Sequence, residues 1–347
     1  MPLSAIQIDT LSKNVIDHYR KNPLVDQINV ERPLFDELLK KPKDLIGGKE
    51  FLVSQLFISN NDNTQTYAGN ARVTYNNRNP DEQVKYRWTN LHAGFTVSED
   101  ELFHAGIKVT DDKGKNLATR EEAIVLANYM ESRLKALEEG HKDAIHAQMW
   151  LDGTQATDNV PGIDALVSLT PTVGTVGALS AATNTYWRND ARTGLASTLT
   201  ALTDAMEKAK RAIMRTKGRV TNIYAGSDFI DALRNAVIGA NVTQITYGGG
   251  SKIAIDMATS QMKFDGIPIV WVPDFDTSFG TSPAISFAKR CYMLDMRYLA
   301  FGRDPDDFLR MRYPGRPQDQ YVFYYGLTSK ISMETTGRNK QSVLSIA

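Results

Sequence analysis

The chain has 347 residues, enough for two or three domains, and 42% of them are hydrophobic, as in an ordinary globular protein. Its 40 Lys and Arg residues balance 40 Asp and Glu residues, so the formal net charge is zero. This balance argues against a dedicated nucleic-acid-binding protein and is compatible with close self-association. With one cysteine, no signal peptide and no apolar run long enough for a membrane span, the sequence predicts a soluble protein without disulfides, made inside the cell.

Residues 1–48 are predicted to form an N-terminal arm, because short apolar runs alternate with prolines and cannot build a core of their own. Within the arm, Ser12–Tyr19 and Pro33–Leu39 are candidate short helices, and the chain between them is expected to be extended. The alternative is a poorly ordered terminus.

Residues 49–97 predict a hairpin. Strand-forming residues dominate 49–58 and 71–75, and 83–97 alternates between apolar and polar residues with a period of two. The segments between these strands are polar and rich in turn-forming residues. The region 57–88 is therefore predicted to be a long two-stranded hairpin with a polar tip, which needs a partner because an isolated hairpin is only marginally stable.

Residues 98–167 contain two helix starts with capping boxes. Ser98 and Glu101 open a short helix, and Thr119 and Glu122 open a long helix that is predicted to end near Leu151. Apolar residues of the long helix recur every three or four positions, at Ala123, Ala127, Met130, Leu134, Leu137, Ala144 or Ile145, and Met149. The charged residues between them predict a solvated face. At 1.5 Å per residue, about 33 residues form a rod of roughly 50 Å, which needs a long surface to pack against.

The rest of the chain has an α/β pattern. Residues 168–197 are predicted to be a loop with a possible short strand. Helices are then expected at 198–215 and 227–238, and strands at 219–226, 252–257, 266–272 and 291–301. Cys291 lies in an apolar run and is expected to be a buried structural thiol. A charged segment, 302–320, precedes a final strand pair at 320–336.

Histidines and glycines do not form a recognisable active-site motif. The five histidines are His18, His92, His104, His141 and His146. The last two are five residues apart, which is not the spacing of paired helical zinc ligands. The glycine-rich segment 247–252 departs from a phosphate-binding loop and is interpreted as a flexible turn.

The acidic cluster Asp304, Asp306 and Asp307 could supply metal ligands or an acid–base pair. Four arginines are close in sequence and are expected to pair with it or with another subunit: Arg303, Arg310, Arg312 and Arg316. We therefore expect no catalytic, cofactor-binding or metal-binding residues, no cofactor and no enzyme activity; a cytosolic hydrolase is the alternative from another class.

The order of parts, which is arm, long hairpin, short helix, long helix, α/β block and return strand, resembles the major capsid proteins of tailed bacteriophages, the Hong Kong 97 fold. Local segments are also similar along nearly the whole chain. YRWTNLHAGFTVSEDEL (86–102) resembles the end of the extended loop, or E-loop, and the 119–151 helix resembles the spine helix. WLDGTQATDNVPGIDALV (150–167) resembles the loop after the spine, KFDGIPIVWVPDF (263–275) a strand of the axial (A) domain, and 298–312 and 321–338 the final strands.

This resemblance implies an α+β capsid fold with five parts. They are an N-terminal arm (1–48), the E-loop hairpin (49–97), a peripheral (P) domain with its spine helix (98–167), the A-domain (168–301) and return strands of the P-domain (302–347). The implied function is a structural subunit that self-assembles into hexamers and pentamers of an icosahedral head enclosing double-stranded DNA. An encapsulin-like nanocompartment shell is the alternative.

The resemblance also implies partners: further copies of the chain, portal and scaffolding proteins, a decoration protein, and packaged DNA contacted without sequence specificity, with no membrane. The expected location is the virion, after synthesis in the host cytoplasm. The long N-terminal scaffolding region of some relatives has no counterpart here, which implies a separate scaffold or a removed segment. Cross-linking between subunits does not carry over, because Lys85 in the hairpin has no matching partner. Tyr67, Tyr75 and Tyr86 are expected to contact an adjacent subunit.

Overall fold

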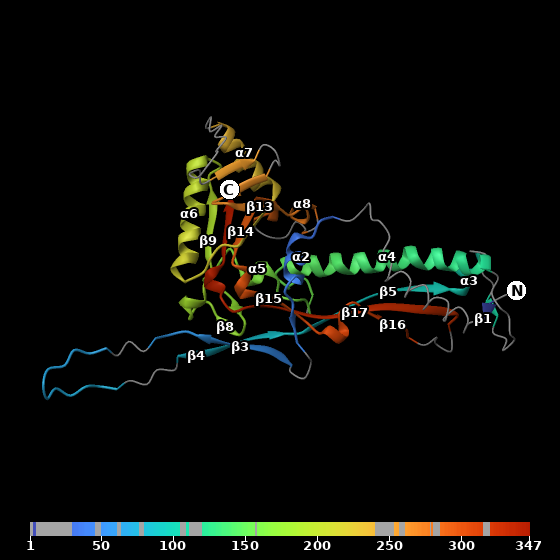
Figure 1. Ribbon diagram of the computed structural model, residues 1–347, viewed down its shortest axis with the longest axis horizontal. Helices are drawn as coiled ribbons and strands as arrows, with labels where there is room; N and C mark the ends of the chain where they lie inside the picture. Colours follow the sequence, from blue (N-terminus) through green and yellow to red (C-terminus); the bar gives the residue numbers. More distant parts are fainter. Residues whose placement is uncertain are drawn as a thin grey trace. The chain divides into compact units, whose positions relative to one another are not determined.

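The computed structural model shows a mixed α+β protein (Figure 1). It describes residues 3–4, 30–45, 50–60, 64–75, 80–104, 109–110, 120–156, 158–239, 253–256, 261–277, 279, 285–314 and 320–347. The chain divides into two compact units, each built from three stretches of sequence. Unit 1 comprises residues 1–30, 90–146 and 303–331, and unit 2 comprises residues 31–89, 147–302 and 332–347.

Unit 1 contains most of the long helix α4, Arg120–Trp150. Its 31 residues confirm the helix predicted over 119–151. Met130 and Leu134 are buried, as the apolar spacing predicts, whereas Leu137 is half-buried. The face that was expected to be solvated is half-buried at its charged positions: Glu131, Arg133, Lys135, Glu138, Glu139 and Lys142.

The predicted short helix is also present in unit 1 as α3, Glu99–His104. Ser98 caps it as expected, because the Ser98 hydroxyl oxygen accepts a hydrogen bond of 3.2 Å from the Glu101 N–H. Its Glu101 carboxylate then accepts a hydrogen bond from the Tyr129 hydroxyl on α4. The other predicted cap, Thr119, lies outside the described residues.

Unit 1 also contains strands, including most of β17. The 14-residue strand β17, Val322–Thr335, pairs with β16, Arg310–Arg312, and with β5, Thr89–Ser98. The register with β16 is antiparallel, with Met311 opposite Leu327. Short elements complete the unit: β1 (Leu3–Ser4), β6 (Val109–Thr110) and the 3₁₀ turn η4 (Pro305–Asp307).

Two strand predictions in this region are wrong. The pair predicted over 320–336 is one continuous strand, because Gly326 makes room for a neighbour and does not form a turn: a Cβ there would lie 2.8 Å from His92 Nε2. The single strand predicted over 83–97 is interrupted at Trp88. Its alternation shifts there, so that Thr89 is buried although the period of two predicts an exposed side chain.

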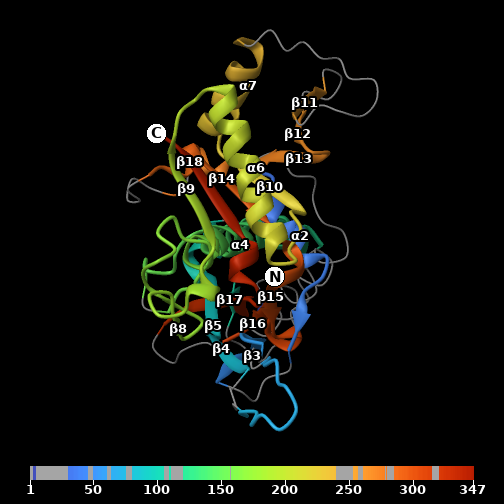
Figure 2. The ribbon, with the colours of Figure 1, turned by 90° about the vertical axis from the view of Figure 1, so that its left-hand side faces the viewer.

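Unit 2 is built on a seven-stranded sheet of order β11-β12-β13-β10-β14-β18-β9 (Figure 2). The strands are β9 (Asp190–Leu195), β10 (Asn222–Ala225), β11 (Ile253–Asp256), β12 (Gln261–Phe264), β13 (Ile267–Trp271), β14 (Arg290–Leu294) and β18 (Ser342–Ile346). Strand β10 runs parallel to β13 and antiparallel to β14. Strand β18, which the sequence grouped with the return strands, lies between β14 and β9.

The predicted strands at 219–226, 252–257 and 266–272 are confirmed as β10, β11 and β13, but β12 was missed. Asp265 and Gly266 connect β12 to β13 in a two-residue loop, and both have positive φ angles, 52° and 80°. An Asp-Gly loop of this kind is the strongest short hairpin signal in a sequence. The dipeptide could therefore have identified β12.

Helices α6, Leu199–Arg215, and α7, Ser227–Gly239, pack on this sheet and confirm the two predicted helices. Thr198 caps α6 by accepting a hydrogen bond from the Ala201 N–H. The shared core includes Leu202, Met206, Ile213, Phe229, Leu233, Ile223, Met293 and Leu344. Each fully buried aliphatic or aromatic side chain contributes about 1.5–3 kcal/mol of hydrophobic free energy, so this core holds the helices on the sheet.

The strand predicted over 291–301 is wrong in its second half. Strand β14 ends at Leu294, the 3₁₀ turn η3 (Met296–Tyr298) follows, and β15 (Leu299–Arg303) belongs to a different sheet. The cause is Asp295, which is fully buried and accepts hydrogen bonds from the backbone N–H groups of Arg219 and Arg297. A carboxylate with these partners turns the chain out of the sheet.

The remaining elements of unit 2 are short. The predicted helix at Pro33–Leu39 is confirmed as α2, whereas Ser12–Tyr19 and 247–252 lie outside the described residues. The others are β2 (Lys43–Asp44), β3 (Phe51–Phe57), β4 (Asp81–Arg87), α5 (Ile163–Leu166), β7 (Thr175–Val176), β8 (Leu179–Ser180), η1 (Thr185–Trp187), α8 (Asp274–Thr277), η2 (Phe287–Lys289) and η5 (Arg338–Lys340).

Cys291 lies in the centre of the seven-stranded sheet and is fully buried. Burial raises the pKa of its thiol, so the reactive thiolate is scarce at neutral pH. We expect a thiol reagent to label the native protein slowly and to label it fully once denaturant is added. The rate of labelling, followed by absorbance or mass, checks this, and rapid labelling of native protein would contradict it.

Candidate functional site

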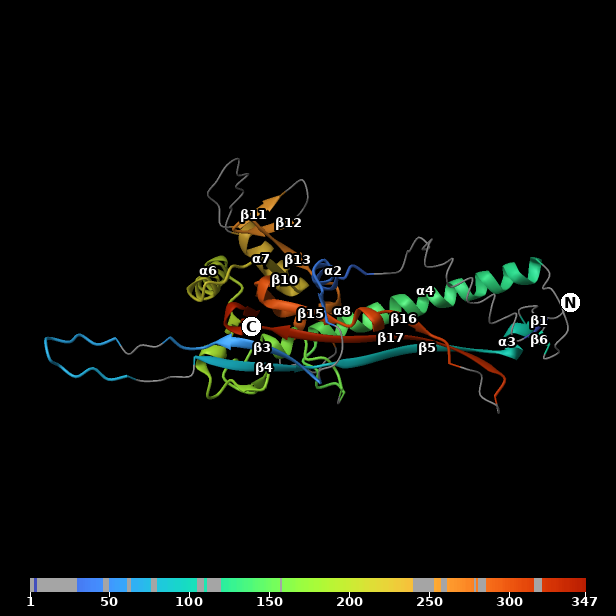
Figure 3. The same cartoon turned by 60° about the horizontal axis from the view of Figure 1, so that its bottom comes forward.

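The feature of unit 2 with the most unusual surface is the hairpin, here defined as β3, β4 and residues 58–80 between them. Strands β3 and β4 pair in antiparallel register from Phe51 opposite Arg87 to Phe57 opposite Asp81. The two strands run side by side in Figure 3. The predicted paired region, 57–88, is therefore displaced: pairing lies in 51–57 and 81–87.

The predicted strand at 71–75 is wrong, and the described residues 64–75 form no strand. The side chains of 64–75 are all exposed, so neither face of this segment packs on a core. Tyr67 is 70% exposed and Tyr75 is 91% exposed. Such a segment, with large aromatic side chains in water, is available to a partner molecule.

The pair of strands β3 and β4 has two different faces. Leu52, Leu56, Val84 and Tyr86 are buried, whereas Phe51, Val53 and Phe57 on the other face of β3 are exposed. Phe57 is 70% exposed. One face therefore fixes the hairpin to unit 2, and the other presents an apolar strip.

Tyr86 belongs to the buried face, which corrects the expectation that it contacts a second subunit. It is 3% exposed, and its hydroxyl donates a 2.9 Å hydrogen bond to the Thr335 carbonyl oxygen. Burial raises the pKa of the Tyr86 phenol, so it remains a neutral donor. Tyr86 and Val84 are two residues apart in one strand, so their side chains lie on the same face. Both are therefore buried where this face packs on unit 2.

The last residues of β17 hold the base of the hairpin through polar contacts. The buried Glu334 carboxylate pairs with Lys43 Nζ at 2.5 Å and accepts a hydrogen bond from the Ser54 hydroxyl at 3.3 Å. The Ser332 hydroxyl donates to the Arg87 carbonyl oxygen at 2.9 Å. These contacts orient the base, whereas the described residues 64–75 toward the tip are exposed.

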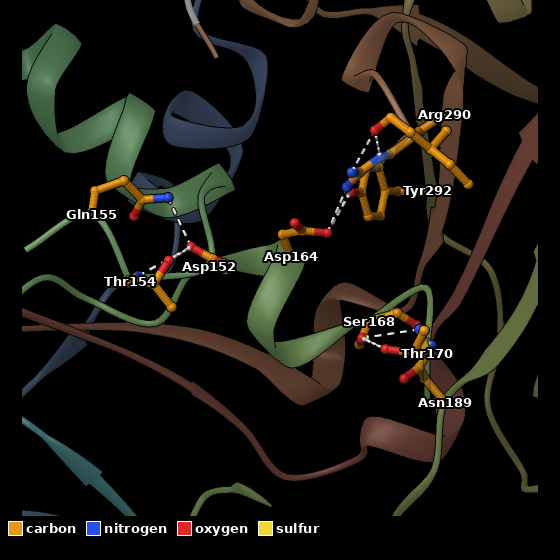
Figure 4. Close-up of polar contacts among 10 residues, drawn as sticks. Asp152, Thr154, Gln155, Asp164, Ser168, Thr170, Asn189, Arg290 and Tyr292 are labelled. Carbon is orange, nitrogen blue, oxygen red and sulfur yellow. Dashed lines mark hydrogen bonds and ion pairs between the residues drawn. The ribbon is translucent and has the colours of Figure 1, made fainter. Parts of the chain in front are cut away.

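A second polar network fixes the segment that follows α4 (Figure 4). The Arg290 guanidinium, 1% exposed, donates to Asp164 at 2.6 Å, to the Tyr292 hydroxyl at 3.0 Å and to the Ile285 carbonyl oxygen at 2.7 Å. It also lies 4.1 Å from the centre of the Phe287 ring. The ion pair joins α5 to strand β14 within unit 2.

Gly162 makes this segment possible. A Cβ there would lie 2.4 Å from the carbonyl oxygens of Gln148 and Met149, so no other residue fits without displacing the backbone. Its N–H donates to the Leu151 carbonyl oxygen at 2.9 Å, at the end of α4. The absence of a side chain at Gly162 thus allows the loop after α4 to pack directly against the last turn of the helix.

Two smaller polar sets in Figure 4 are structural. Asp152 accepts hydrogen bonds from the Thr154 N–H and hydroxyl and from the Gln155 amide, as in a turn that follows a helix. The Asn189 amide donates to the Ser168 carbonyl oxygen at 2.8 Å.

In the acidic cluster of unit 1, Asp307 pairs with Arg312, one of the four arginines predicted to pair with it. Asp307 accepts hydrogen bonds from Arg312 at 2.8 Å and from the Thr328 hydroxyl at 2.6 Å. Burial opposes the charged form, but these hydrogen bonds hold the pKa of Asp307 below its ordinary range. Asp304 accepts from the Asp306 N–H in a turn, and Arg316 lies outside the described residues.

The described histidines do not belong to a metal-binding group, although His92 is a neighbour of His141. His18 lies outside the described residues, and among those that are described no three His, Cys, Asp or Glu side chains are grouped as metal ligands. His141 is buried and its Nε2 lies 2.9 Å from the Ser329 hydroxyl, which also accepts from the Leu309 N–H.

Within the described part of the chain, no helix has the length and apolar character of a membrane span.

His141 predicts a pH dependence of stability. Burial, and secondarily the neighbouring His92, lowers the pKa of His141 below its ordinary value of 6.5. Because the folded-state pKa is depressed, the stabilisation is present above the unfolded-state pKa and is lost as pH falls through the folded-state pKa. We expect the urea midpoint to decrease between pH 7.5 and 5.0, and to decrease less in His141→Gln. His104→Gln, at an exposed position, is the control and should behave as the parent; equal pH dependence in His141→Gln and the parent would contradict the assignment.

Comparison with known proteins gives a match in structure only. No protein-family model and no curated protein matches the sequence. The cyanophage A-1(L) capsid asymmetric unit matches with a TM-score of 0.62 at 14% identity, over 93% of this chain and 94% of that chain. The capsid of an empty GTA particle matches with a TM-score of 0.56 at 12% identity, over 94% of each chain. A chain of Mycobacterium phage Bobi matches with a TM-score of 0.55 at 8% identity, over 94% of this chain and 93% of that chain. The mixed α+β fold of this protein is therefore the fold of phage capsid chains.

Proposed function

We propose that this chain is the major capsid protein of a tailed bacteriophage, a subunit that self-assembles into the hexamers and pentamers of an icosahedral head enclosing double-stranded DNA. The observation that carries the proposal is the extent of the structural likeness. It includes 93–94% of this chain and 94% of both capsid chains, so it is not confined to one common α/β module. Sequence identity of 12–14% shows the fold only, and the function is our inference from it.

The parts of the fold take roles in this proposal. The hairpin would be the E-loop, α4 the spine helix of the P-domain, and β16 and β17 its return strands. The seven-stranded sheet with α6 and α7 would be the A-domain, and residues 1–48 the N-terminal arm. The exposed apolar strip and the exposed tyrosines of the hairpin support its role, because a surface of this kind is suited to contact with another subunit.

The remaining partners follow from the same proposal. We infer contacts with portal, scaffolding and decoration proteins, and contact with packaged DNA without sequence specificity. Synthesis in the host cytoplasm would precede incorporation into the virion. A structural role is supported over a catalytic one by the buried polar networks, whose acidic side chains are engaged by basic side chains and hydroxyl groups of the same unit.

Electron microscopy of the purified full-length protein, combined with sedimentation velocity, tests the proposal. The expected result is closed shells of uniform diameter with five- and six-membered rings. A protein that remains monomeric at all concentrations, in the presence and absence of a crowding agent, would overturn it. Nuclease-resistant DNA inside particles from infected cells would support a phage head, whereas a co-purifying enzyme inside them would indicate a nanocompartment.

A further inference from the structure

The C-terminal end of α6 has an exposed positive surface. Arg215, Lys217 and Arg219 are exposed, and no carboxylate in the described parts of the chain pairs with their side chains. Earlier on the helix, by contrast, Lys208 pairs with Asp204 at 2.6 Å and Lys210 pairs with Asp265.

An apolar side chain lies within this positive surface. Met214 is 56% exposed. Arg211 lies three residues before it, on the same face of the helix as Met214 and Arg215. Arg211, Met214, Arg215, Lys217 and Arg219 are called the basic patch below.

Unit 2 also has an exposed negative surface, which includes the first turn of α7. Asp228 and Asp231 are exposed there, and no basic side chain in the described ranges pairs with either. Asp276 accepts 2.8 Å hydrogen bonds from the Ser227 hydroxyl and from Trp271 Nε1. Asp276 thereby holds an indole that is 52% exposed. Asp228, Asp231, Trp271 and Asp276 are called the acidic patch below.

The two patches lie at different parts of the same sheet. Helix α6 packs against β9 and β18, whereas Trp271 is on β13 (Figure 2). Four strand-to-strand steps separate β13 from β9, which is roughly 19 Å at about 4.8 Å per step. Helices α6 and α7 contact each other, but the charged residues are separated along the strands. Arg219 precedes β10 and Asp228 follows it, and the four residues of this strand span roughly 13 Å at about 3.3 Å per residue. Within the described residues, no side chain of one patch pairs with a side chain of the other.

We propose that the basic patch of one copy binds the acidic patch of the next copy, in a head-to-tail contact that repeats around a ring. This inference rests on the proposed function and adds the surface by which neighbouring subunits recognise each other. A chain of zero net charge that concentrates unpaired cations in one place and unpaired anions in another is complementary to itself. A contact of either patch with its own copy would bring like charges together, whereas basic-to-acidic contact between neighbouring copies brings opposite charges together. Repeated from copy to copy, this contact is heterologous, and heterologous contacts form closed rings when the rotation closes.

The side chains of the two patches suit a protein partner. Arginine, methionine and tryptophan are enriched at protein interfaces, and an arginine guanidinium binds well over an indole ring. The exposed Met214 and Trp271 would be covered in this contact, and the surrounding charges would set which surface meets which. A nucleic acid would use the cations but would leave the acidic patch without a role.

Charge reversal tests the contact. In the negative variant, Arg215→Glu, Lys217→Glu and Arg219→Glu leave Arg211 as the one cation of the basic patch, so both patches are negative. In the positive variant, Asp228→Lys and Asp231→Lys leave Asp276 as the one anion of the acidic patch, so both patches are positive. Each variant is expected to lose closed particles by about tenfold or more, because like charges then face each other. The chain that carries all five substitutions has exchanged charges and is expected to assemble again. Circular dichroism shows whether each variant is folded, and Lys41→Glu with Arg310→Glu is a control that reverses two exposed cations outside the patches.

A mixture of the two variants gives a second test. The negative variant can bind only the positive variant on either side, so the two must alternate around a ring. Alternation closes a six-membered ring but not a five-membered ring. We therefore expect the equimolar mixture to form hexameric rings, sheets or tubes, with both variants in equal amounts, and few closed shells.

The outcomes separate this inference from the proposed function. If the parent does not assemble, the proposed function fails. If the parent and both charge-reversed variants assemble equally, the function stands and the head-to-tail contact is wrong. If the negative and positive variants are folded but the chain with all five substitutions fails to assemble, charge pairing between the patches is wrong as well. Loss of salt-dependent DNA retention in the negative variant, with assembly intact, would assign the basic patch to nucleic acid and overturn the contact.

Discussion

Replacing residues 59–79 with a short Gly-Ser turn is expected to leave the subunit folded and to abolish closed shells. The subunit is expected to stay folded because the described side chains of 64–75 are all exposed, so their removal costs no buried contact. The paired base remains, since the Ile58 N–H donates to the Pro80 carbonyl oxygen at 2.8 Å just outside the deletion. Shells are lost because the exposed Tyr67 and Tyr75 are removed together with the reach of the hairpin.

The measurement is paired. Circular dichroism and the denaturant midpoint report folding, and sedimentation with electron microscopy reports assembly. A variant in which a Gly-Ser sequence of equal length replaces the same residues separates the side chains of the tip from its length. Normal shells from the shortened protein would show that the hairpin is not an intersubunit contact, and the proposed function would lose its main local support.

Asp164→Ala is expected to lower the free energy of unfolding by about 3–5 kcal/mol, the usual effect of removing one partner from a buried ion pair. It leaves the Arg290 guanidinium, 1% exposed, with the Ile285 carbonyl oxygen and the Tyr292 hydroxyl as its polar partners among the described residues. The free energy is measured by denaturant unfolding, in the hairpin-shortened protein if assembly interferes. Asp164→Leu with Arg290→Met removes both charges and should recover much of the loss, because no uncompensated charge remains.

A surface pair in the same unit is the matched comparison. Lys208 and Asp204 are as close, at 2.6 Å, but each side chain is 52% exposed. Lys208→Ala should change stability by less than about 1 kcal/mol. Equal effects of Asp164→Ala and Lys208→Ala would mean that burial of the Arg290 pair has no energetic consequence.

Elements whose signal lies in neighbouring residues were predicted well from the sequence. The helices α4, α6 and α7 and the cap at Ser98 depend on residues within a few positions of each other, and the structure confirms them. The order of these elements then carried the resemblance to the capsid fold. A resemblance in order survives at sequence identities where no family model matches.

The errors arose where a distant residue decides the local structure. Asp295 ends β14 because the N–H groups of Arg219 and Arg297 bind its carboxylate, and the first of these lies 76 residues away. Gly326 stays within β17 because His92 approaches it. Neither cause can be found in a window of ten residues.

The candidate site shows the same limit. The sequence identified the hairpin, but it did not separate the face that fixes the hairpin from the face that is exposed. Tyr86 was therefore assigned to a partner although it donates to Thr335, which is 249 residues away. The basic and acidic patches were missed because ordinary charged residues become a surface only when the fold leaves them unpaired.

Strand β3 carries a hazard that follows from its position and composition. Its sequence, FLVSQLF, has no charge and no proline, and β4 is the strand that pairs with it among the described residues. A short, uncharged strand with high β propensity and an open edge is the kind of segment from which amyloid-like aggregates grow. In an unassembled chain, orderly docking and disordered edge-to-edge stacking would compete for this strand. The yield of soluble protein would then depend on how long chains remain unassembled. A charge introduced at Val53, on the exposed face, should slow precipitation of free chains during overproduction.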